Sequence, residues 1–232
     1  MALLKIDDMP GLAPQKGGRN IFFVRHGRTQ LNGEMRYQGR TDVPLNDEGR
    51  EQALRTALRF SQSRIDAVIC SPLLRACETA RIIASHHIGI AAEKNDLFTE
   101  FDFGAWEKLT AEEIRTLSGA EYFKKWSAAP LDMEVPGGER LEAFFERCVA
   151  ASEYLLSRNE ENIIVVGHGA MFRGLFLSML KYDRTSIFWR MRLDNCSITT
   201  FGVTANRFML KRLNDDIHIK IDKNFISCVP VM

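Results

Sequence analysis

The chain has 232 residues, of which 45% are hydrophobic and 26% are charged, a composition that excludes whole-chain disorder and collagen-like repeats. Its length suits one domain, or one domain with an insertion. The 31 lysines and arginines nearly balance the 30 aspartates and glutamates. The resulting net charge of +1 argues against bulk binding to nucleic acid or to a membrane surface, which is driven largely by excess positive charge.

The first strand is expected shortly after residue 20. Residues 1–19 contain Gly and Pro without periodicity, and we expect a loose N-terminal arm there. The apolar run Ile21-Phe22-Phe23-Val24, followed by Gly27, is typical of a strand buried on both faces. Asn46 is placed to cap a helix over the next dozen residues, because asparagine is a preferred N-cap.

A second buried strand and its helix come next. Ala67-Val68-Ile69-Cys70 is the strand, and Ser71-Pro72 then supplies an N-cap and a first-turn proline, which predict a helix to about residue 85. Residues 104–138 carry several aromatic side chains and no clear strand, so we expect a helical insertion or lid. Within it, Thr110 and Glu113 have the spacing of a capping box.

The last third of the chain repeats the alternation of strand and helix. A helix is expected from residue 139 to about 157, a third buried strand at Ile163-Ile164-Val165-Val166, and a helix over 170–180. Three late segments are predicted as strands, the last of them an edge strand: 197–203, 208–213 and 217–221. The pattern predicts an α/β fold, a mainly parallel sheet flanked by helices, spanning residues 20–222, with residues 223–232 as a C-terminal tail.

The cysteines and the most apolar segment bear on the compartment. The five cysteines form no CxxC pair, which favours free buried thiols in a reducing compartment; they are Cys70, Cys77, Cys148, Cys196 and Cys228. Residues 1–20 lack the apolar stretch of a secretory signal. Residues 163–180 contain His168 and Arg173, so they suit a strand and helix better than a membrane span. We expect a cytoplasmic protein.

Polar side chains follow the three predicted buried strands. Arg25 and His26 directly follow the first, Arg75 lies early in the helix after the second, and His168 directly follows the third. Because ligands bind beyond the carboxyl ends of the strands in open α/β sheets, we expect these four residues to converge. Guanidinium groups match phosphate oxygens, and a neutral imidazole can attack phosphorus. The surrounding positive charge should lower the pKa of His26 and keep it neutral.

A single histidine at a strand end is more often structural, but here six sequence blocks occur in order over about residues 20–202. They are Arg25-His26-Gly27 with Thr29 and Asn32, continuing through Gln38-Gly39-Arg40-Thr41-Asp42-Val43-Pro44-Leu45; Ser71-Pro72-Leu73-Leu74-Arg75-Ala76; Glu100-Phe101-Asp102-Phe103-Gly104-Ala105-Trp106-Glu107; Pro136-Gly137-Gly138-Glu139; Val166-Gly167-His168-Gly169 with Arg173; and Asn195-Cys196-Ser197-Ile198. Together they resemble the histidine phosphatase superfamily, in its phosphoglycerate mutase-like branch, and within it the phosphatases of the α-ribazole and broad-specificity type.

The resemblance implies a role for each matching residue. His26 would be the nucleophile and carry a phosphohistidine, and Glu100 would be the general acid and then the general base. The phosphoryl group would be held by Arg25, Asn32, Arg75 and His168. The rim of the pocket would include Gln38 and Gly39. From the residues alone, Asp102 and Glu107 compete with Glu100 for the acid role, because loop carboxylates are usually only solvated.

Neither a metal nor a cofactor is expected. The sequence has no HExxH, no EF-hand loop, no Cys-rich ligand cluster and no GxxxxGK[ST] loop. Arginines, histidine and a positioned carboxylic acid can perform phosphoryl transfer by binding charge and moving a proton. The expected partner is a small phosphomonoester, with no nucleic acid and no membrane; a homodimer is left open.

Hydrolysis of small phosphorylated metabolites is therefore the predicted function, with two alternatives. The resemblance associates mutases with a longer, basic insertion, whereas residues 104–138 lack a paired arginine run. A non-catalytic phosphate-binding regulator is disfavoured because both His26 and Glu100 are present. Four residues depart from the family pattern and leave the substrate subfamily open, although none is expected to touch the core of the site: Arg28, Lys108, Arg140 and Ala170.

Overall fold

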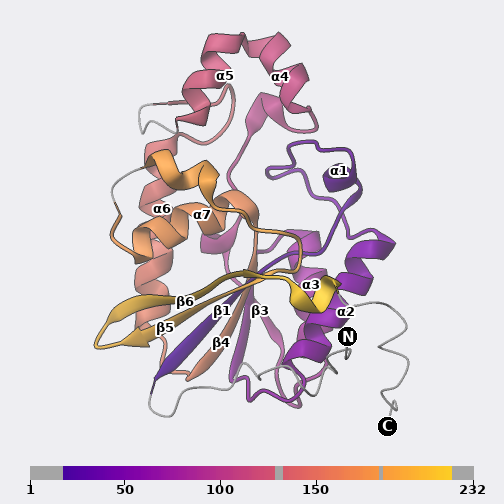
Figure 1. The fold of residues 1–232 in the computed structure, drawn as a ribbon, viewed down its shortest axis with the longest axis vertical. Coiled ribbons are helices and arrows are strands. Elements are labelled where there is room, and N and C mark those ends of the chain that lie inside the picture. The colour runs from indigo at the N-terminus through magenta and orange to yellow at the C-terminus, as the bar shows by residue number, and fades with distance from the viewer. Residues whose placement is uncertain (1–17, 129–132, 183–184, 221–232) are drawn as a thin grey trace, which may run out of the picture.

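The computed structural model describes residues 18–128, 133–182 and 185–220 (Figure 1). The arm expected for residues 1–19 lies outside the described residues except at its end, and the tail expected for 223–232 lies outside them altogether. The first strand begins at Arg19, one residue inside the expected arm.

The strands form one six-stranded sheet in the order β3-β2-β4-β1-β5-β6. Their bounds are β1 Arg19–Arg25, β2 Ala67–Cys70, β3 Ala92–Lys94, β4 Asn162–Gly167, β5 Ile198–Thr204 and β6 Arg207–Asp215. The first four are parallel, β5 runs antiparallel to β1, and β6 runs antiparallel to β5. The predicted mainly parallel α/β fold is confirmed.

The alternation of strand side chains divides the core into two layers. Ile21, Phe23 and Val165 lie in the cluster on one face of the sheet, and Phe22 and Ile164 lie in the cluster on the other. Two helices cover each face (Figure 1). They are α2 Asp47–Phe60 and α3 Leu74–Ala84 on one side, and α6 Leu141–Ser157 and α7 Gly169–Met179 on the other. The continuous apolar strands are thus covered on both sides, as buried parallel strands require.

The insertion is helical, as predicted, and lies at the top of Figure 1. Its helices are α4 Ala111–Ser118 and α5 Ala120–Ser127, preceded by η3 Gly104–Trp106; residues 129–132 fall outside the described part. Trp106 and Trp126 are buried, with ring centroids 5.4 Å apart, and Trp126 lies equally close to Phe101 beside the sheet. This aromatic packing joins the insertion to the core of the α6 and α7 face.

The shorter elements complete the described fold. They are α1 Gln30–Gly33, η2 Asp96–Phe98, η4 Thr185–Arg190 and α8 Ile217–Lys220. The predicted caps are confirmed, since Asn46 accepts from the backbone of Gly49 and Thr110 forms a capping box with Glu113.

Two sequence predictions of local structure were wrong, and one strand was missed. Helix α3 begins at Leu74, because the Ser71 hydroxyl accepts from the backbone of Leu73 and contacts His168 instead of capping the helix. Residues 217–220 form a helical turn, α8, in place of the edge strand predicted over 217–221, whose last residue lies outside the described part. Four residues cannot distinguish a period of 2 from one of 3.6, and the buried side chain there is His218, which bonds Thr56 and the carbonyl of Cys196. Strand β3 has mostly exposed side chains and gave no signal.

Two further expectations concern the thiols and the membrane. The cysteines of the described residues are buried and free; they are Cys70, Cys77, Cys148 and Cys196, and Cys228 falls outside this part of the chain. Burial raises the pKa of Cys70 and of Cys196 to about 12. In the three described ranges, no helix combines the length and apolarity that crossing a membrane requires.

Candidate active site

A cavity of about 190 Å³ opens beyond the carboxyl ends of the central parallel strands. Its lining includes seven of the eight residues expected at the site: Arg25, His26, Asn32, Gln38, Gly39, Arg75 and Glu100. The eighth, His168, is fully buried beside them, with its ring centroid 5.1 Å from that of His26. The structure therefore brings together side chains from the ends of β1, β2 and β4, as the strand pattern predicts.

His26 is a buried neutral imidazole with one nitrogen free. Its Nδ1 lies 2.7 Å from the carbonyl oxygen of Gly27, and because a carbonyl only accepts, the proton sits on Nδ1. The lone pair is then on Nε2, which makes no hydrogen bond within the described residues. Burial, followed by the charges of Arg75 and Arg25, holds the pKa of His26 well below 6.5. Near neutral pH, Nε2 is an available nucleophile.

His168 is positioned by a serine at the end of the neighbouring strand. Its Nε2 lies 2.7 Å from Ser71 Oγ, while Nδ1 is buried and has no partner in the described part of the chain. Burial and then the charge of Arg75 hold the pKa of His168 well below its ordinary value. If the serine hydroxyl donates to Nε2, the ring proton is on Nδ1. His168 can then donate a hydrogen bond to a bound anion.

Two arginines carry charge that no carboxylate neutralises by direct contact. The Arg75 guanidinium is buried and donates to the carbonyls of Gly39 at 2.7 Å and Thr41 at 2.9 Å. Arg25 donates to the carbonyl of Leu193 at 2.6 Å. Neither forms an ion pair among residues 18–128, 133–182 and 185–220, and both Nε atoms lack a partner there. Burial lowers the pKa of Arg75 to about 10. Such fixed, unneutralised guanidinium groups are suited to a phosphate.

The loop after β1 supplies further donors. Asn32 Oδ1 accepts from the backbone of Thr29, so the amide nitrogen of Asn32 is the group left for a ligand. Gln38 is oriented in the same way, since its Oε1 accepts from Thr29 Oγ1. Gly39 has φ +54°, and a Cβ there would lie 2.0 Å from Glu107 Oε1. Glycine at this position thus lets its carbonyl reach Arg75.

The structure distinguishes between the three carboxylates that the sequence offers as the general acid. Only Glu100 lines the described cavity, and its carboxylate accepts from the backbone of Ala170 at 3.1 Å and Met171 at 2.8 Å, at the start of α7. Glu107 instead accepts from the backbone of Thr41 and holds the loop that contains Gly39. Asp102 accepts from the backbone of Gly104. Glu100 is therefore the carboxylate placed to exchange a proton with a ligand.

Several site residues were not predicted. Asn195 donates to the backbone carbonyl of His26 at 2.9 Å and to Asn32 Oδ1 at 3.3 Å, so it fixes both; its block was recognised but gave it no role. Other residues that line the cavity, besides those expected, include Arg36, Tyr37, Phe103, Arg173 and Trp189. Phe103 stands in the block that contains Glu100, and Arg173 in the block that contains His168, but neither was given a role. Tyr37 and Trp189 lie in no recognised block, and no signal in the sequence would have found them.

Three of the four departures from the family pattern lie outside the cavity. The expectation that none touches the site is wrong for Ala170, which lines the cavity and donates its backbone N–H to Glu100. Arg28 pairs with Glu48 at 3.0 Å, and Arg140 pairs with Glu142 at 3.7 Å. Lys108 adopts φ +66° and donates its backbone N–H to the carbonyl of Tyr37. The described residues contain no group of three or more His, Cys, Asp or Glu side chains arranged to hold a metal ion.

Comparisons with known proteins show the family and the fold. A sequence model of the histidine phosphatase superfamily, branch 1, matches residues 21–216. The chain is 30% identical over 200 residues to phosphoserine phosphatase 1 of Hydrogenobacter thermophilus, covering 86% of this chain and 93% of that protein. It is 37% identical to phosphoglycerate mutase-like protein 4 of Arabidopsis thaliana, over 67% of this chain and 69% of that protein. The solved α-ribazole phosphatase of Shigella flexneri superposes with a TM-score of 0.72 at 26% identity, covering 85% of this chain and 96% of that one.

Proposed function

From the chain's membership of the histidine phosphatase superfamily, we propose that it hydrolyses small phosphorylated metabolites. In this proposal the phosphoryl group passes through a phosphohistidine on His26, and no metal ion takes part. The phosphatases among the relatives of the chain support phosphatase activity. The observation that carries the proposal is the neutral His26 beside two arginines; among the described residues, His26 Nε2 has no hydrogen-bond partner and neither arginine forms an ion pair. A nucleophile and a binding site for a dianion thus occupy one small cavity.

In the first step His26 Nε2 attacks phosphorus, a P–N bond forms and the ester P–O bond breaks. Glu100, as the carboxylic acid, gives its proton to the departing alkoxide, which is otherwise a poor leaving group. The non-bridging oxygens are held by Arg25 and Arg75, with further hydrogen bonds from the Asn32 amide and from His168 Nδ1. These donors are already fixed by carbonyl and hydroxyl partners, so little reorganisation is needed as charge moves.

The second step returns the enzyme to its starting state. The Glu100 carboxylate takes a proton from water, the water oxygen attacks phosphorus, and the P–N bond breaks. Inorganic phosphate leaves and His26 is again neutral, with its proton on Nδ1. The arginines bind the phosphoryl charge throughout, which is the contribution that metal ions make in many other phosphoryl-transfer enzymes.

The first experiment measures hydrolysis of p-nitrophenyl phosphate by wild type and His26→Ala, with and without EDTA. We expect activity that resists EDTA and is abolished in His26→Ala. The matched control is Arg28→Gln, a surface arginine outside the cavity, which should keep wild-type activity. EDTA-sensitive turnover would contradict metal independence, and residual turnover in His26→Ala near the wild-type rate would contradict the nucleophile.

Glu100 is tested through the leaving group. Glu100→Gln removes the proton donor, so it should slow esters with poor alkyl leaving groups by about 10²-fold or more and aryl esters with good leaving groups much less. The measurement compares kcat on an alkyl phosphate with kcat on p-nitrophenyl phosphate. Equal slowing of both would count against Glu100 as the acid. Product that carries phosphate on a second alcohol, formed faster than inorganic phosphate, would favour the mutase alternative.

A further inference from the structure

We propose that Arg173 binds a carboxylate of the substrate, so that the preferred substrates are phosphomonoesters of small hydroxy acids or hydroxy amino acids. This inference rests on the proposed function and specifies the substrate class of the same site. It is carried by a third arginine of the cavity that phosphate binding leaves unused.

Arg173 is held in place but keeps most of its donors free. It lies in the second turn of α7, its Nε donates to the carbonyl of Met191 at 2.8 Å, and its guanidinium lies 5.7 Å from the ring centroid of Trp189. In the described part of the chain, neither Nη atom has a hydrogen-bond partner and no carboxylate pairs with the side chain. Burial first, and then the charge of Arg25, lower its pKa to about 10. Two N–H-bearing nitrogens therefore face the cavity with no partner of their own.

Arg173 lies beside the phosphate-binding group. A Cβ on Gly169 would be 3.2 Å from Arg173 Nη1 and 3.7 Å from the Arg25 guanidinium carbon, so both guanidinium groups lie against this glycine. A ligand whose phosphate contacts Arg25 thus has its neighbouring atoms close to Arg173. The spacing suits a second anionic group a few bonds from the phosphate.

The charges of the cavity indicate what that group is. A phosphomonoester dianion is matched by Arg25 and Arg75, and Glu100 is uncharged when it acts as the acid. Arg36 also lines the cavity, but its guanidinium pairs with Glu113 at 2.6 Å and Glu34 at 3.1 Å. Arg173 alone remains unmatched among these arginines, and a carboxylate matches a guanidinium in charge and in geometry.

The size of the cavity limits the rest of the substrate. Its volume of about 190 Å³ is below the roughly 300–1,000 Å³ typical of sites for drug-sized ligands. A phosphorylated acid of a few carbons suits this volume better than a nucleotide does. The aromatic wall of Tyr37, Phe103 and Trp189 would cover such a molecule on its uncharged side.

The test uses substrates that differ only in the carboxylate. O-phosphoserine and O-phosphoethanolamine form one such pair, and 3-phosphoglycerate and glycerol phosphate form another. We expect wild type to favour the acid of each pair by about 10-fold or more in kcat/KM, since a charge-assisted bidentate contact is among the stronger hydrogen-bonding contacts. Arg173→Gln should reduce this ratio to near one, mainly by raising KM for the acids. Arg173→Lys, which keeps the charge but loses the fork, should fall between.

Each outcome decides the matter. A wild-type ratio near one, with p-nitrophenyl phosphate still hydrolysed, overturns the inference and leaves the proposed function standing. An unchanged ratio in Arg173→Gln overturns it as well, since Arg173 would then serve only the fold or the phosphoryl group. Failure to hydrolyse any ester, p-nitrophenyl phosphate included, overturns the proposed function itself. Arg28→Gln is the control that should keep both rates and ratio, and if Arg173→Gln does not fold, the wild-type ratio and Arg173→Lys decide.

Discussion

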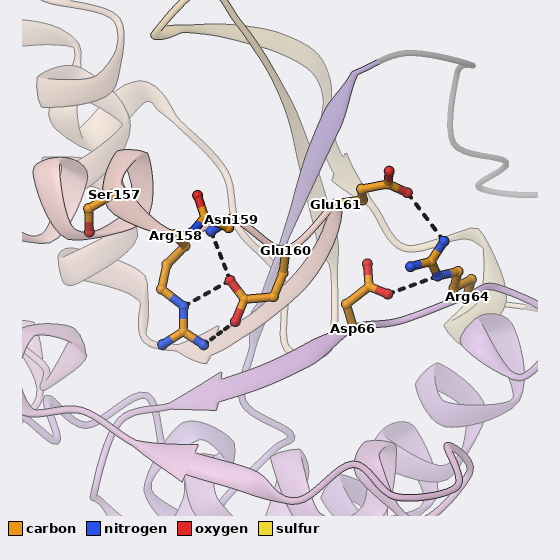
Figure 2. A pocket seen from close by; sticks show the side chains of 7 residues that line it. All are labelled: Arg64, Asp66, Ser157, Arg158, Asn159, Glu160 and Glu161. Atoms are coloured by element: carbon orange, nitrogen blue, oxygen red, sulfur yellow. Dashed lines mark hydrogen bonds and ion pairs between the residues drawn. The ribbon is translucent and has the colours of Figure 1, made fainter.

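The arginines at the two ends of the central sheet differ in their partners: those at the amino end are half-buried or exposed and paired with carboxylates, and those at the carboxyl end are desolvated and unpaired among the described residues. At the amino ends of β2 and β4 lies the larger cavity, about 570 Å³, lined by Arg64, Asp66, Ser157, Arg158, Asn159, Glu160 and Glu161 (Figure 2). Each arginine there meets carboxylates: Arg158 pairs with Glu160 at 2.5 Å, and Arg64 pairs with Asp66 and Glu161. At the carboxyl ends, Arg25, Arg75 and Arg173 have no such partner within the described residues.

The difference shows that unneutralised charge, not volume, distinguishes the candidate site. Glu160 raises the pKa of Arg158, whereas burial lowers the pKa of Arg75 to about 10. At the paired end, carboxylates of the protein already neutralise the arginine charges, so no ligand is needed there. The unpaired end holds desolvated positive charge, which costs folding free energy until an anion binds. Four predictions test this contrast, taken from the largest expected effect to the smallest.

Arg75→Met should lower kcat/KM for p-nitrophenyl phosphate by about 10³-fold, because it removes a guanidinium that stabilises transferring phosphoryl charge. Arg158→Met, the matched change at the paired end, should leave kcat and KM unchanged. Steady-state kinetics of both variants provide the measurement. A loss below tenfold in Arg75→Met, or a comparable loss in Arg158→Met, would remove the functional distinction between the two ends.

Orthovanadate, a mimic of the phosphoryl transition state, should raise the unfolding temperature of wild type and of Arg158→Met. At about 100 times its dissociation constant, an anion that binds only the folded state adds about 2.7 kcal/mol, or roughly 5–10 °C for a chain of this size. The shift should vanish in Arg75→Met. Differential scanning fluorimetry in a buffer without phosphate measures it, and an equal shift in all three proteins would place the anion elsewhere.

The buried neutral histidines should make stability depend on pH. In the folded chain, the pKa of His26 and of His168 lies well below 6.5. Below about pH 6.5 the unfolded chain therefore binds protons that the folded chain does not, and the free energy of unfolding decreases as the pH is lowered. Each histidine contributes up to about 2 kcal/mol of loss between about pH 7 and pH 5. His26→Asn should therefore lose less stability than wild type over this window in urea unfolding. An identical loss would mean that His26 protonates normally in the folded chain.

The smallest effect is expected at the paired end. Glu160→Gln breaks the pair with Arg158, whose side chain is 22% exposed, and partly exposed ion pairs are worth little. We expect a loss of about 1 kcal/mol or less in the free energy of unfolding and no change in kcat or KM. Urea unfolding and p-nitrophenyl phosphate kinetics check both parts. A change in turnover would connect this end to the site and weaken the contrast.

Much of the site could be predicted because its residues follow a local pattern. Arg25, His26 and His168 stand at the ends of continuous apolar runs, and parallel strands bring their carboxyl ends to one edge. The sheet and its flanking helices followed from the same runs. The chemical roles of these residues stay predictions until the variants are measured.

What the sequence could not show depends on contacts between distant segments. Ser71 reads as a helix cap, yet its hydroxyl contacts His168, 97 positions away. Choosing Glu100 over Glu107 as the acid required the structure, because it shows that Glu100 lines the cavity and Glu107 does not. Arg36 is paired with Glu113, 77 positions away, whereas Arg173 has no carboxylate partner among the described residues. Such pairings are set by the assembled fold, and no periodicity or spacing encodes them.

The most direct measurement of the central claim is a search for the phosphoenzyme. Wild type and Glu100→Gln are mixed with substrate, denatured in alkali within the first turnovers, and mapped by peptide mass spectrometry. The account predicts one added phosphoryl group on His26 that survives alkali and is lost in acid, accumulating in Glu100→Gln because water is no longer activated. A phosphoryl group on another residue, or steady turnover with no burst of released alcohol and no adduct in either protein, would contradict it.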